Sequence, residues 1–252
     1  MKITILGSGT STGVPMVGCS CPVCTSEDPR DKRTRSSILI ETSGKHILVD
    51  TSTDLRKQAI REKVPMIDAV LFTHAHADHI HGIDDLRGFH FLHKRIIPCY
   101  GRKETLDLIA DNFSYIFKGM ESQGYAPLLE AHEVHQPFQL FGKTVVPIPL
   151  LHGSTQATGY RIDNVAYLTD CSSIPAASMA MLTGLELLII DALRYTPHIT
   201  HFNIEGALRV VEDLKPQRTL FTHLTHEVSC RDGERLPAGV ELAYDGMVLE
   251  TE

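Results

Sequence analysis

The stretch "THAHADHIHG", residues 73–82, holds four histidines and one aspartate within ten positions. It follows the apolar run "DAVLF", where a buried strand would end. His74 and His76 are two positions apart, so their side chains can share one side of an extended backbone, and Asp78 and His79 follow them. The pattern differs from the i,i+4 histidine pair that binds zinc on a protease helix. It predicts a loop that supplies ligands to two metal ions.

Further ligand candidates are isolated residues that directly follow strand-like runs. His152 follows "VVPIPLL", Asp170 follows "VAYLT" and His223 follows "RTLFT". A lone histidine in a loop is usually solvated or hydrogen-bonded. These residues are therefore candidate metal ligands only because the histidine cluster at 73–82 is present. Six nitrogen or oxygen donors with one bridging carboxylate would satisfy a dinuclear site with open positions for water and substrate.

Composition places the chain among ordinary globular proteins. Its 252 residues are 42% hydrophobic and 22% charged, and we expect a single domain over 1–252. The net charge of −7 argues against a broad electrostatic grip on nucleic acid, so we expect no nucleic-acid partner. The N-terminal apolar run is too short for a signal peptide, and no stretch approaches the roughly 20 apolar residues of a membrane span. We therefore expect a cytoplasmic protein without membrane contact.

Short β-branched runs alternate with turn signals along the chain, and "SGK" between two of them reads as a hairpin turn. Helical patterns occur at 53–62, 103–112, about 175–183 and 203–214. Strand runs dominate each half, which predicts an α/β fold of packed sheets with helices outside. The strand candidates are 2–6, 36–42, 45–50, 68–73, 95–100, 143–150, 158–162, 165–170, 186–191, 218–223 and 246–251.

The segment "GSGTSTGVP" after the first strand run invites comparison with a dinucleotide-binding loop. Its glycines at 7, 9 and 13 miss the G-x-G-x-x-G spacing by one position. We interpret the segment as a tight turn that brings backbone close to the metal cleft.

Three of the six cysteines are clustered in "GCSCPVC". In a reducing compartment, clustered cysteines are more often metal ligands or redox groups than a disulfide framework. The thiolates of Cys19, Cys21 and Cys24 need a fourth donor to close a tetrahedral structural zinc site, and His226 in "THLTHE" is the best candidate. A set of redox cysteines is the alternative.

The motif "THAHADH" is similar to the T-H-x-H-x-D-H signature of the metallo-β-lactamase superfamily, which folds as an αββα sandwich. His152, Asp170 and His223 fall in the order and chain context of that superfamily's remaining ligands. The resemblance implies that three histidines hold one metal, that a mixed set holds the other, and that Asp170 bridges them. The two sets are His74, His76 and His152, and Asp78, His79 and His223.

With the C-x-C-x-x-C and T-H-x-x-H motifs added, the chain resembles the phosphoribosyl 1,2-cyclic phosphate phosphodiesterases of phosphonate breakdown, the PhnP type. That resemblance implies a structural Cys3His zinc, two catalytic divalent ions (Zn or Mn) and a homodimer. It implies that a hydroxide bridging both metals opens 5-phosphoribosyl 1,2-cyclic phosphate or a similar small-molecule phosphodiester. Asp78 would orient or deprotonate the water, and His201 would protonate the departing oxygen, with His198 as a competitor. Arg87 either balances phosphate charge or pairs with a neighbouring aspartate.

Two other functions fit parts of the pattern. A tRNase Z-like RNA 3′-processing endonuclease shares the catalytic residues. Such enzymes, however, grip tRNA with a long arm between the ligands that match His152 and Asp170, where only 17 residues stand here, 153–169. A non-enzymatic PqqB-like binding or carrier protein shares the cysteine cluster but is thought to lack a full dinuclear set. All seven ligands are present here, so the preferred prediction is a dinuclear metal-dependent hydrolase of phosphoric diesters.

Overall fold

The computed structural model of the chain describes residues 1–118 and 128–251, which form two seven-stranded sheets. The first has the order β14-β1-β2-β3-β4-β5-β6 and the second the order β13-β12-β11-β10-β9-β8-β7. The first sheet consists of Lys2–Gly7 (β1), Ser37–Thr42 (β2), Lys45–Val49 (β3), Ala69–Leu71 (β4), Ile97–Gly101 (β5), Leu129–Glu133 (β6) and Val248–Glu250 (β14). The second consists of Phe138–Leu140 (β7), Lys143–His152 (β8), Thr155–Ile162 (β9), Val165–Leu168 (β10), Leu187–Asp191 (β11), Arg218–Thr222 (β12) and Val240–Leu242 (β13).

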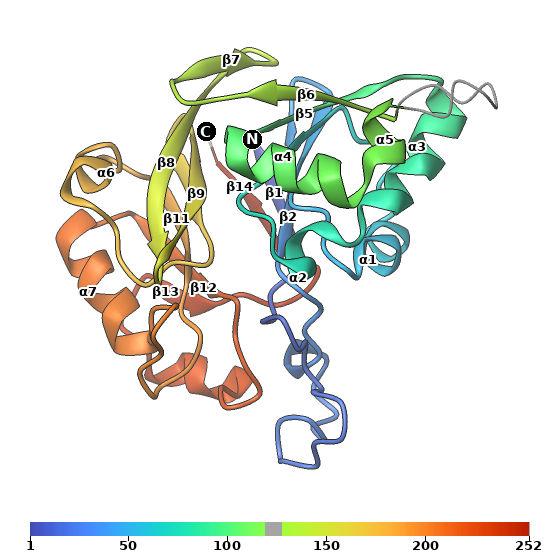
Figure 1. Ribbon diagram of the computed structural model, residues 1–252. Coiled ribbons are helices and arrows are strands. Elements are labelled where there is room, and N and C mark those ends of the chain that lie inside the picture. Colours follow the sequence, from blue (N-terminus) through green and yellow to red (C-terminus); the bar gives the residue numbers. More distant parts are fainter. Residues whose placement is uncertain (119–127, 252) are drawn as a thin grey trace.

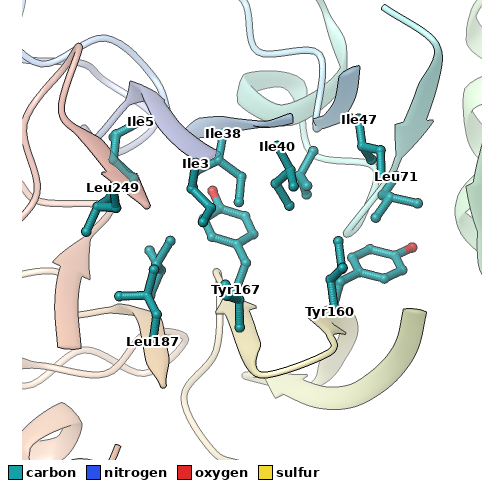
Figure 2. Close-up of a cluster of buried hydrophobic side chains, with 14 of the residues drawn as sticks. Ile3, Ile5, Ile38, Ile40, Ile47, Leu71, Tyr160, Tyr167, Leu187 and Leu249 are labelled. Carbon is teal, nitrogen blue, oxygen red and sulfur yellow. The ribbon is translucent and has the colours of Figure 1, made fainter. Parts of the chain in front are cut away.

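The two sheets pack face to face over a shared apolar core, which Figure 2 shows in close-up. Ile38 and Ile40 on β2 point into this core, where they meet Tyr160 and Tyr167 of the second sheet. Leu39, between the two isoleucines, belongs to a different cluster on the outer face of the first sheet. Because successive strand residues face opposite sides, the "SILIET" run buries both of its faces.

Helices cover the outer face of each sheet (Figure 1). Against the first sheet pack Leu55–Arg61 (α1), Ala77–Ile80 (α2), Leu86–His93 (α3), Lys103–Asn112 (α4) and Ser114–Lys118 (α5). Against the second pack Ala176–Ala180 (α6) and Ile204–Leu214 (α7). Short 3-10 helices span Pro29–Asp31 (η1), Ile83–Asp85 (η2) and Cys230–Arg235 (η4). The layers run helix, sheet, sheet, helix, which confirms the predicted α/β sandwich of αββα type.

Elements with strong local patterns lie where the sequence predicts them. The "SGK" turn joins antiparallel β2 and β3, with Ser43 and Gly44 both at positive φ. In α7, the Asn203 side chain caps the helix by accepting from the Gly206 N–H. The sequence patterns do not predict strands β6, β7 and β13 or helices α2, α3 and α5. These elements are short or carry polar residues on most positions, as in the β6 sequence "LEAHE".

Several parallel strands end at the same edge of the molecule and carry polar residues there. β3 and β4 are parallel, and so are β10, β11 and β12. Asp50 directly follows β3, Asp170 is the second residue after β10, and His223 directly follows β12. All three have positive φ, between 55° and 63°. L-residues rarely adopt this conformation, and such residues gather at functional sites. This edge is therefore where chemistry is expected.

No helix among the described residues is both long and apolar enough to cross a membrane.

Candidate metal centre

Asp170 lies at the centre of the site. Its Oδ1 atom is 3.2 Å from Nε2 of both His79 and His223. Its Oδ2 atom is 3.5 Å from Nε2 of His74 and 3.9 Å from Nε2 of His152. Each carboxylate oxygen therefore faces a different pair of imidazoles, as a ligand that bridges two ions would.

The predicted ligands form two donor groups that share this carboxylate. Within each group the candidate ligand atoms all lie within 4.8 Å of one another. His76 is the exposed member, with its ring centroid 4.5 Å from that of His74 and 5.0 Å from that of His152. Residues from both sheets contribute to each group. The first donor group is His74, His76, His152 and Asp170, and the second donor group is Asp78, His79, Asp170 and His223.

Asp50 and Thr73 orient two of the histidine rings. His79 Nδ1 donates to Asp50 Oδ2 over 2.7 Å, and both side chains are fully buried. The Thr73 hydroxyl donates to the same oxygen at 2.7 Å, and its own oxygen lies 3.0 Å from His74 Nδ1. With Nδ1 of each ring acting as the donor, Nε2 is left with its lone pair directed at the centre.

His201 stands at the edge of the cluster and is held by Asp191. Its Nδ1 donates to Asp191 Oδ2 over 2.7 Å, and its Nε2 lies 4.0 Å from Asp170 Oδ2. The backbone N–H of Cys171 donates to the same Asp191 oxygen at 3.1 Å, which fixes the carboxylate. The His201 ring also lies edge-on to His152, with centroids 4.7 Å apart. Asp191 therefore fixes the His201 ring with its Nε2 atom facing the donor groups.

Buried polar atoms without hydrogen-bond partners show that this donor set fits metal ions. Among the described residues, these orphaned atoms include His74 Nε2, Asp78 Oδ2, His79 Nε2 and both ring nitrogens of His223. Leaving such groups unpaired in the interior is costly unless something else binds them. His152 keeps its Nε2 free in the same way, because its Nδ1 donates to the Thr200 carbonyl oxygen over 2.7 Å. Imidazoles and carboxylates that converge with free lone pairs are a metal-binding set.

The carboxylates and imidazoles of the cluster shift each other's ionisation. Burial raises the pKa of Asp170, but His223, His79 and His74 outweigh burial and hold it well below its usual range. Burial likewise lowers the pKa of His223, but Asp170 and Asp78 overcome this and raise it to about 9. For His74, burial and the neighbouring His79 hold the pKa well below its usual value. The site therefore concentrates negative charge on Asp78 and Asp170, where cations would be attracted.

The cysteine cluster forms a second, separate donor group. Cys19 Sγ and Cys21 Sγ lie 3.2 Å and 3.3 Å from His226 Nδ1. Together with Cys24 Sγ, the ligand atoms lie within 4.8 Å of one another, and all six cysteines of the chain are free. Backbone N–H groups of Met16 and Cys24 donate to cysteine sulfurs, and the Cys24 N–H is the main cause that lowers the pKa of Cys21 to about 6. Three sulfurs and one imidazole at this spacing suit one tetrahedral zinc ion.

The glycine turn lies against the loop that follows His223. The Leu224 N–H donates to the Ser8 carbonyl, and the Thr10 N–H donates to the Leu224 carbonyl. A Cβ on Gly7 would lie 2.0 Å from a backbone oxygen of the neighbouring segment, so only glycine fits there. As predicted, the turn brings backbone close to the donor groups, through Leu224, which follows the candidate ligand His223.

Other candidates from the sequence lie outside the cluster. His81, the fourth histidine of the 73–82 stretch, is exposed and contacts Phe113 edge-on, with ring centroids 5.8 Å apart. His198 is exposed, and its ring centroid is 5.3 Å from that of His201. Arg87 pairs with Asp84 at 2.8 Å on the outer helical layer. Of His198 and His201, it is His201 that lies beside the cluster. Of the two roles considered for Arg87, the structure shows the ion pair with a neighbouring aspartate.

Asp50 and Asp191 are potential ligands by their place at the ends of strand runs, but in the structure each contacts a histidine instead: Asp50 contacts His79 and Asp191 contacts His201. Thr73 is not among the predicted site residues. The sequence signal for the two aspartates is their position directly after the buried strand runs "KHILV" and "LLII". Thr73 opens the histidine motif itself. Their partners, however, lie 29 residues away for Asp50 and 10 residues away for Asp191. No local pattern predicts which histidine each aspartate holds.

The family model described as "Beta-lactamase superfamily domain" matches residues 45–224. The chain therefore belongs to the metallo-β-lactamase superfamily, and its fold and donor groups support a metal-dependent hydrolase. A crystal structure described as a new diphosphatase from the PhnP family superposes with a TM-score of 0.93 and 44% identity, covering 100% of this chain and 98% of that one.

Two further similarities extend this picture. The octanoyltransferase of Porphyromonas gingivalis is 42% identical over 98% of this chain, and this chain spans 51% of that protein's length. The Zn²⁺-bound structure of PqqB from Methylobacterium extorquens superposes with a TM-score of 0.83 and 20% identity, covering 100% of both chains. At that identity the likeness concerns the fold alone.

Proposed function

We propose that this chain is a PhnP-type phosphodiesterase that opens a small cyclic phosphodiester such as 5-phosphoribosyl 1,2-cyclic phosphate. The observation that carries the proposal is the His201–Asp191 pair at the edge of the Asp170 cluster. Expelling a sugar oxygen from phosphorus requires a proton donor at that oxygen. The 44% identical diphosphatase of the PhnP family supports chemistry at phosphorus, and the Cys3His group supports the same branch.

Three ions fit the donor groups in this proposal. One divalent ion would be held by His74, His76, His152 and Asp170, and a second by Asp78, His79, His223 and Asp170. Imidazole and carboxylate ligands suit zinc or manganese. Bound there, the ions would supply Lewis acidity at the phosphoryl oxygens and lower the pKa of a water. A structural zinc would be held by Cys19, Cys21, Cys24 and His226.

The side chains of the site divide the remaining work of hydrolysis. Asp78, whose Oδ2 has no hydrogen-bond partner among the described residues, orients the attacking water and takes its proton. A bond forms from the water oxygen to phosphorus while the bond to one ring oxygen breaks. His201 Nε2 delivers a proton to that departing oxygen, and Asp191 keeps the ring in position. The products are a phosphate monoester and a free hydroxyl on one molecule.

The shape of the stretch between His152 and Asp170 disfavours an RNA substrate. This fully described stretch is a compact antiparallel pair, β9 and β10, joined by a turn at 163–164. It contains no long arm that could grip tRNA. The net charge of −7 also opposes binding to a phosphate backbone.

Steady-state hydrolysis tests the proposal. 5-Phosphoribosyl 1,2-cyclic phosphate, 2′,3′-cyclic nucleotides and pre-tRNA are compared on zinc- and manganese-loaded protein, with Asp78→Ala as the control. We expect a strong preference for the phosphoribosyl ester, which Asp78→Ala abolishes. Metal content of both proteins, measured by elemental analysis, reports separately on the donor groups. If the wild-type protein cleaves none of these esters with either metal, the proposal is wrong, and the carrier function becomes the next hypothesis.

A further inference from the structure

His223 is a candidate ligand whose ring is not anchored by a hydrogen bond. Nδ1 has a hydrogen-bond partner in three other candidate ligands, His74, His79 and His152. Both ring nitrogens of His223 are buried and lack such a partner among the described residues. Apart from ring stacking on His79 and His201, the direction of this ring therefore depends on the backbone after β12. Contacts that hold residues 223–228, which we call the His223 loop, position this ligand.

Arg33 holds the backbone of the His223 loop. Its Nη1 donates to the carbonyl oxygens of Thr225 and Val228, at 3.1 Å and 2.7 Å. Its Nη2 donates to Asp31 Oδ1 at 3.2 Å, and the two side chains are only 1% and 4% exposed. The same Asp31 oxygen accepts from the Cys230 N–H at 2.7 Å, just beyond the loop. A buried guanidinium that binds two carbonyls and a carboxylate fixes the path of the backbone between them.

Arg33 also closes the base of the segment that carries the three clustered cysteines. Its backbone N–H and carbonyl pair with the carbonyl and N–H of Val14, both at 2.8 Å, and so enclose residues 15–32. We call residues 15–32 the cysteine arm, which extends away from the two sheets and is drawn in blue in Figure 1. One residue therefore anchors both the base of the cysteine arm and the His223 loop.

The cysteine arm reaches the same loop a second time through its sulfur atoms. His226 lies three residues after His223, and its Nδ1 is 3.2 Å from Cys19 Sγ and 3.3 Å from Cys21 Sγ. The carbonyl oxygen of His226 is 3.8 Å from Cys21 Sγ. Zinc bound by this group would tie His226 to the arm far more firmly than these contacts do. The cysteine group and the second donor group therefore share one short loop.

We infer that Arg33 is a positioning residue for His223, and that filling the cysteine group with zinc raises the affinity of the second donor group for its ion. The inference rests on the part of the proposed function that assigns ions to the donor groups. A ligand that is already fixed loses less conformational freedom when an ion binds it, so two sites that order one loop favour each other. The first donor group contains no residue of the His223 loop and should be insensitive.

Manganese binding to zinc-free and zinc-loaded wild-type protein tests the coupling. Thiolates select zinc over manganese, so one equivalent of zinc is added to fill the cysteine group, and protection of the cysteines from a thiol reagent verifies its location. Unbound Mn²⁺ is then measured by electron paramagnetic resonance during a titration. We expect one manganese site that ignores zinc and a second site that zinc tightens about 10- to 100-fold. Equal affinities of both sites with and without zinc would overturn the inference.

Two ligand variants identify the manganese site that responds. His152→Ala removes a ligand of the first donor group, and the manganese that remains should still bind more tightly when zinc is present. Asp78→Ala removes a ligand of the second donor group, and the manganese that remains should bind equally with and without zinc. The reverse pattern would place the coupling at the first donor group and would refute the role of the His223 loop.

Arg33→Lys tests the other anchor of the loop. The ammonium keeps the charge beside Asp31 but lacks the planar fork that serves the carbonyls and the carboxylate together. We expect it to weaken one manganese site about 10- to 100-fold in zinc-loaded protein, with zinc still bound. Arg161→Lys is the matched control, because Arg161 Nη1 also donates to two carbonyls, those of Met181 and Thr183, at 2.7 Å and 2.9 Å. That loop contains no residue of either donor group, so both manganese affinities should stay unchanged even if the melting temperature falls.

These titrations contain no ester, so they separate the inference from the proposed activity. If no ester is cleaved but one manganese site depends on zinc and on Arg33, the phosphodiesterase proposal fails and the coupling stands. If Arg33→Lys has no effect, or the same effect as Arg161→Lys, the positioning role is wrong. Should Arg33→Lys fail to fold, the zinc comparison on wild-type protein still decides the coupling. Protein that binds no manganese at all would overturn both proposals.

Discussion

Replacing His201 with alanine should slow hydrolysis by an amount that depends on the leaving group. In the proposed mechanism His201 Nε2 gives a proton to the departing oxygen, and Asp191 holds the ring through a 2.7 Å hydrogen bond to Nδ1. A sugar alkoxide is a poor leaving group and needs this proton. A p-nitrophenolate leaves as an anion and does not. The two kinds of ester therefore report on the proton donor separately from metal binding and fold.

The expected magnitudes follow from the contacts. Removing a general acid typically costs about 10²- to 10⁴-fold in rate, so kcat for the cyclic sugar ester should fall by that factor in His201→Ala. Asp191→Asn should be milder, because Cys171 N–H and His201 Nδ1–H both donate to Oδ2 and the amide oxygen can replace that atom. The negative charge is lost, and an amide NH₂ replaces the buried Oδ1, which has no hydrogen-bond partner among the described residues, so the cost should be at least about 1–2 kcal/mol, or roughly five- to thirtyfold in kcat.

The assay measures kcat for the cyclic sugar ester and for bis(p-nitrophenyl) phosphate with both variants, loaded with the same metal. Elemental analysis confirms equal metal content. Both variants should keep p-nitrophenyl hydrolysis within about threefold of wild type, since that reaction does not use the acid. A loss of equal size on the two esters would refute the reasoning and would make His201 a ligand or structural residue instead.

Three other outcomes are expected. Cys21→Ser should reduce bound zinc by one ion per chain in elemental analysis and lower the melting temperature, and an unchanged zinc content would contradict the Cys3His assignment. Gly7→Ala should destabilise the fold by roughly 1–3 kcal/mol or more in urea unfolding, because its Cβ would lie 2.0 Å from a backbone oxygen, whereas Gly88→Ala meets no atom within 4 Å and should be neutral or stabilising. Burial raises the pKa of Asp68, but the hydrogen bond from Lys45 and a backbone N–H outweigh it and hold that pKa below its ordinary value. Asp68→Asn should therefore cost roughly 1–3 kcal/mol at neutral pH. Wild type loses this advantage as pH falls through the ordinary carboxyl range toward the lowered pKa, so a gap that stays constant on acidification would contradict the assignment.

The grouping of the candidate ligands could be predicted because their signals are local. His74, His76, Asp78 and His79 lie in one heptapeptide, and the other three candidates each stand at the end of a recognisable buried strand run. A strand that ends at a polar residue predicts both the element and the place of the side chain. The sandwich itself follows from the strand runs, since "SILIET" has apolar residues on both faces and can only lie between two covering layers.

The groups that orient the ligands could not be predicted in the same way. Asp50 holds His79 and Asp191 holds His201 through contacts that exist only after the sheets have formed. Arg33 reaches the Thr225 and Val228 carbonyls across 192 and 195 residues of chain, and only the packing of the cysteine arm beside the His223 loop brings them together. Periodicity reports which face of an element is buried, but it does not report which partner lies opposite.

The left-handed backbone conformation at Asp50, Asp170 and His223 lowers the stability of the folded protein. An L-residue in this conformation costs roughly 1–2 kcal/mol relative to glycine. At Asp50 the hydrogen bonds to Thr73 and His79 oppose a change to glycine. At Asp170 and His223 a screen of metal-free protein that selected only for thermal tolerance would favour glycine, and would remove candidate ligands as it did so. Consensus or computational stabilisation of this chain should hold those three positions fixed and look for gains elsewhere.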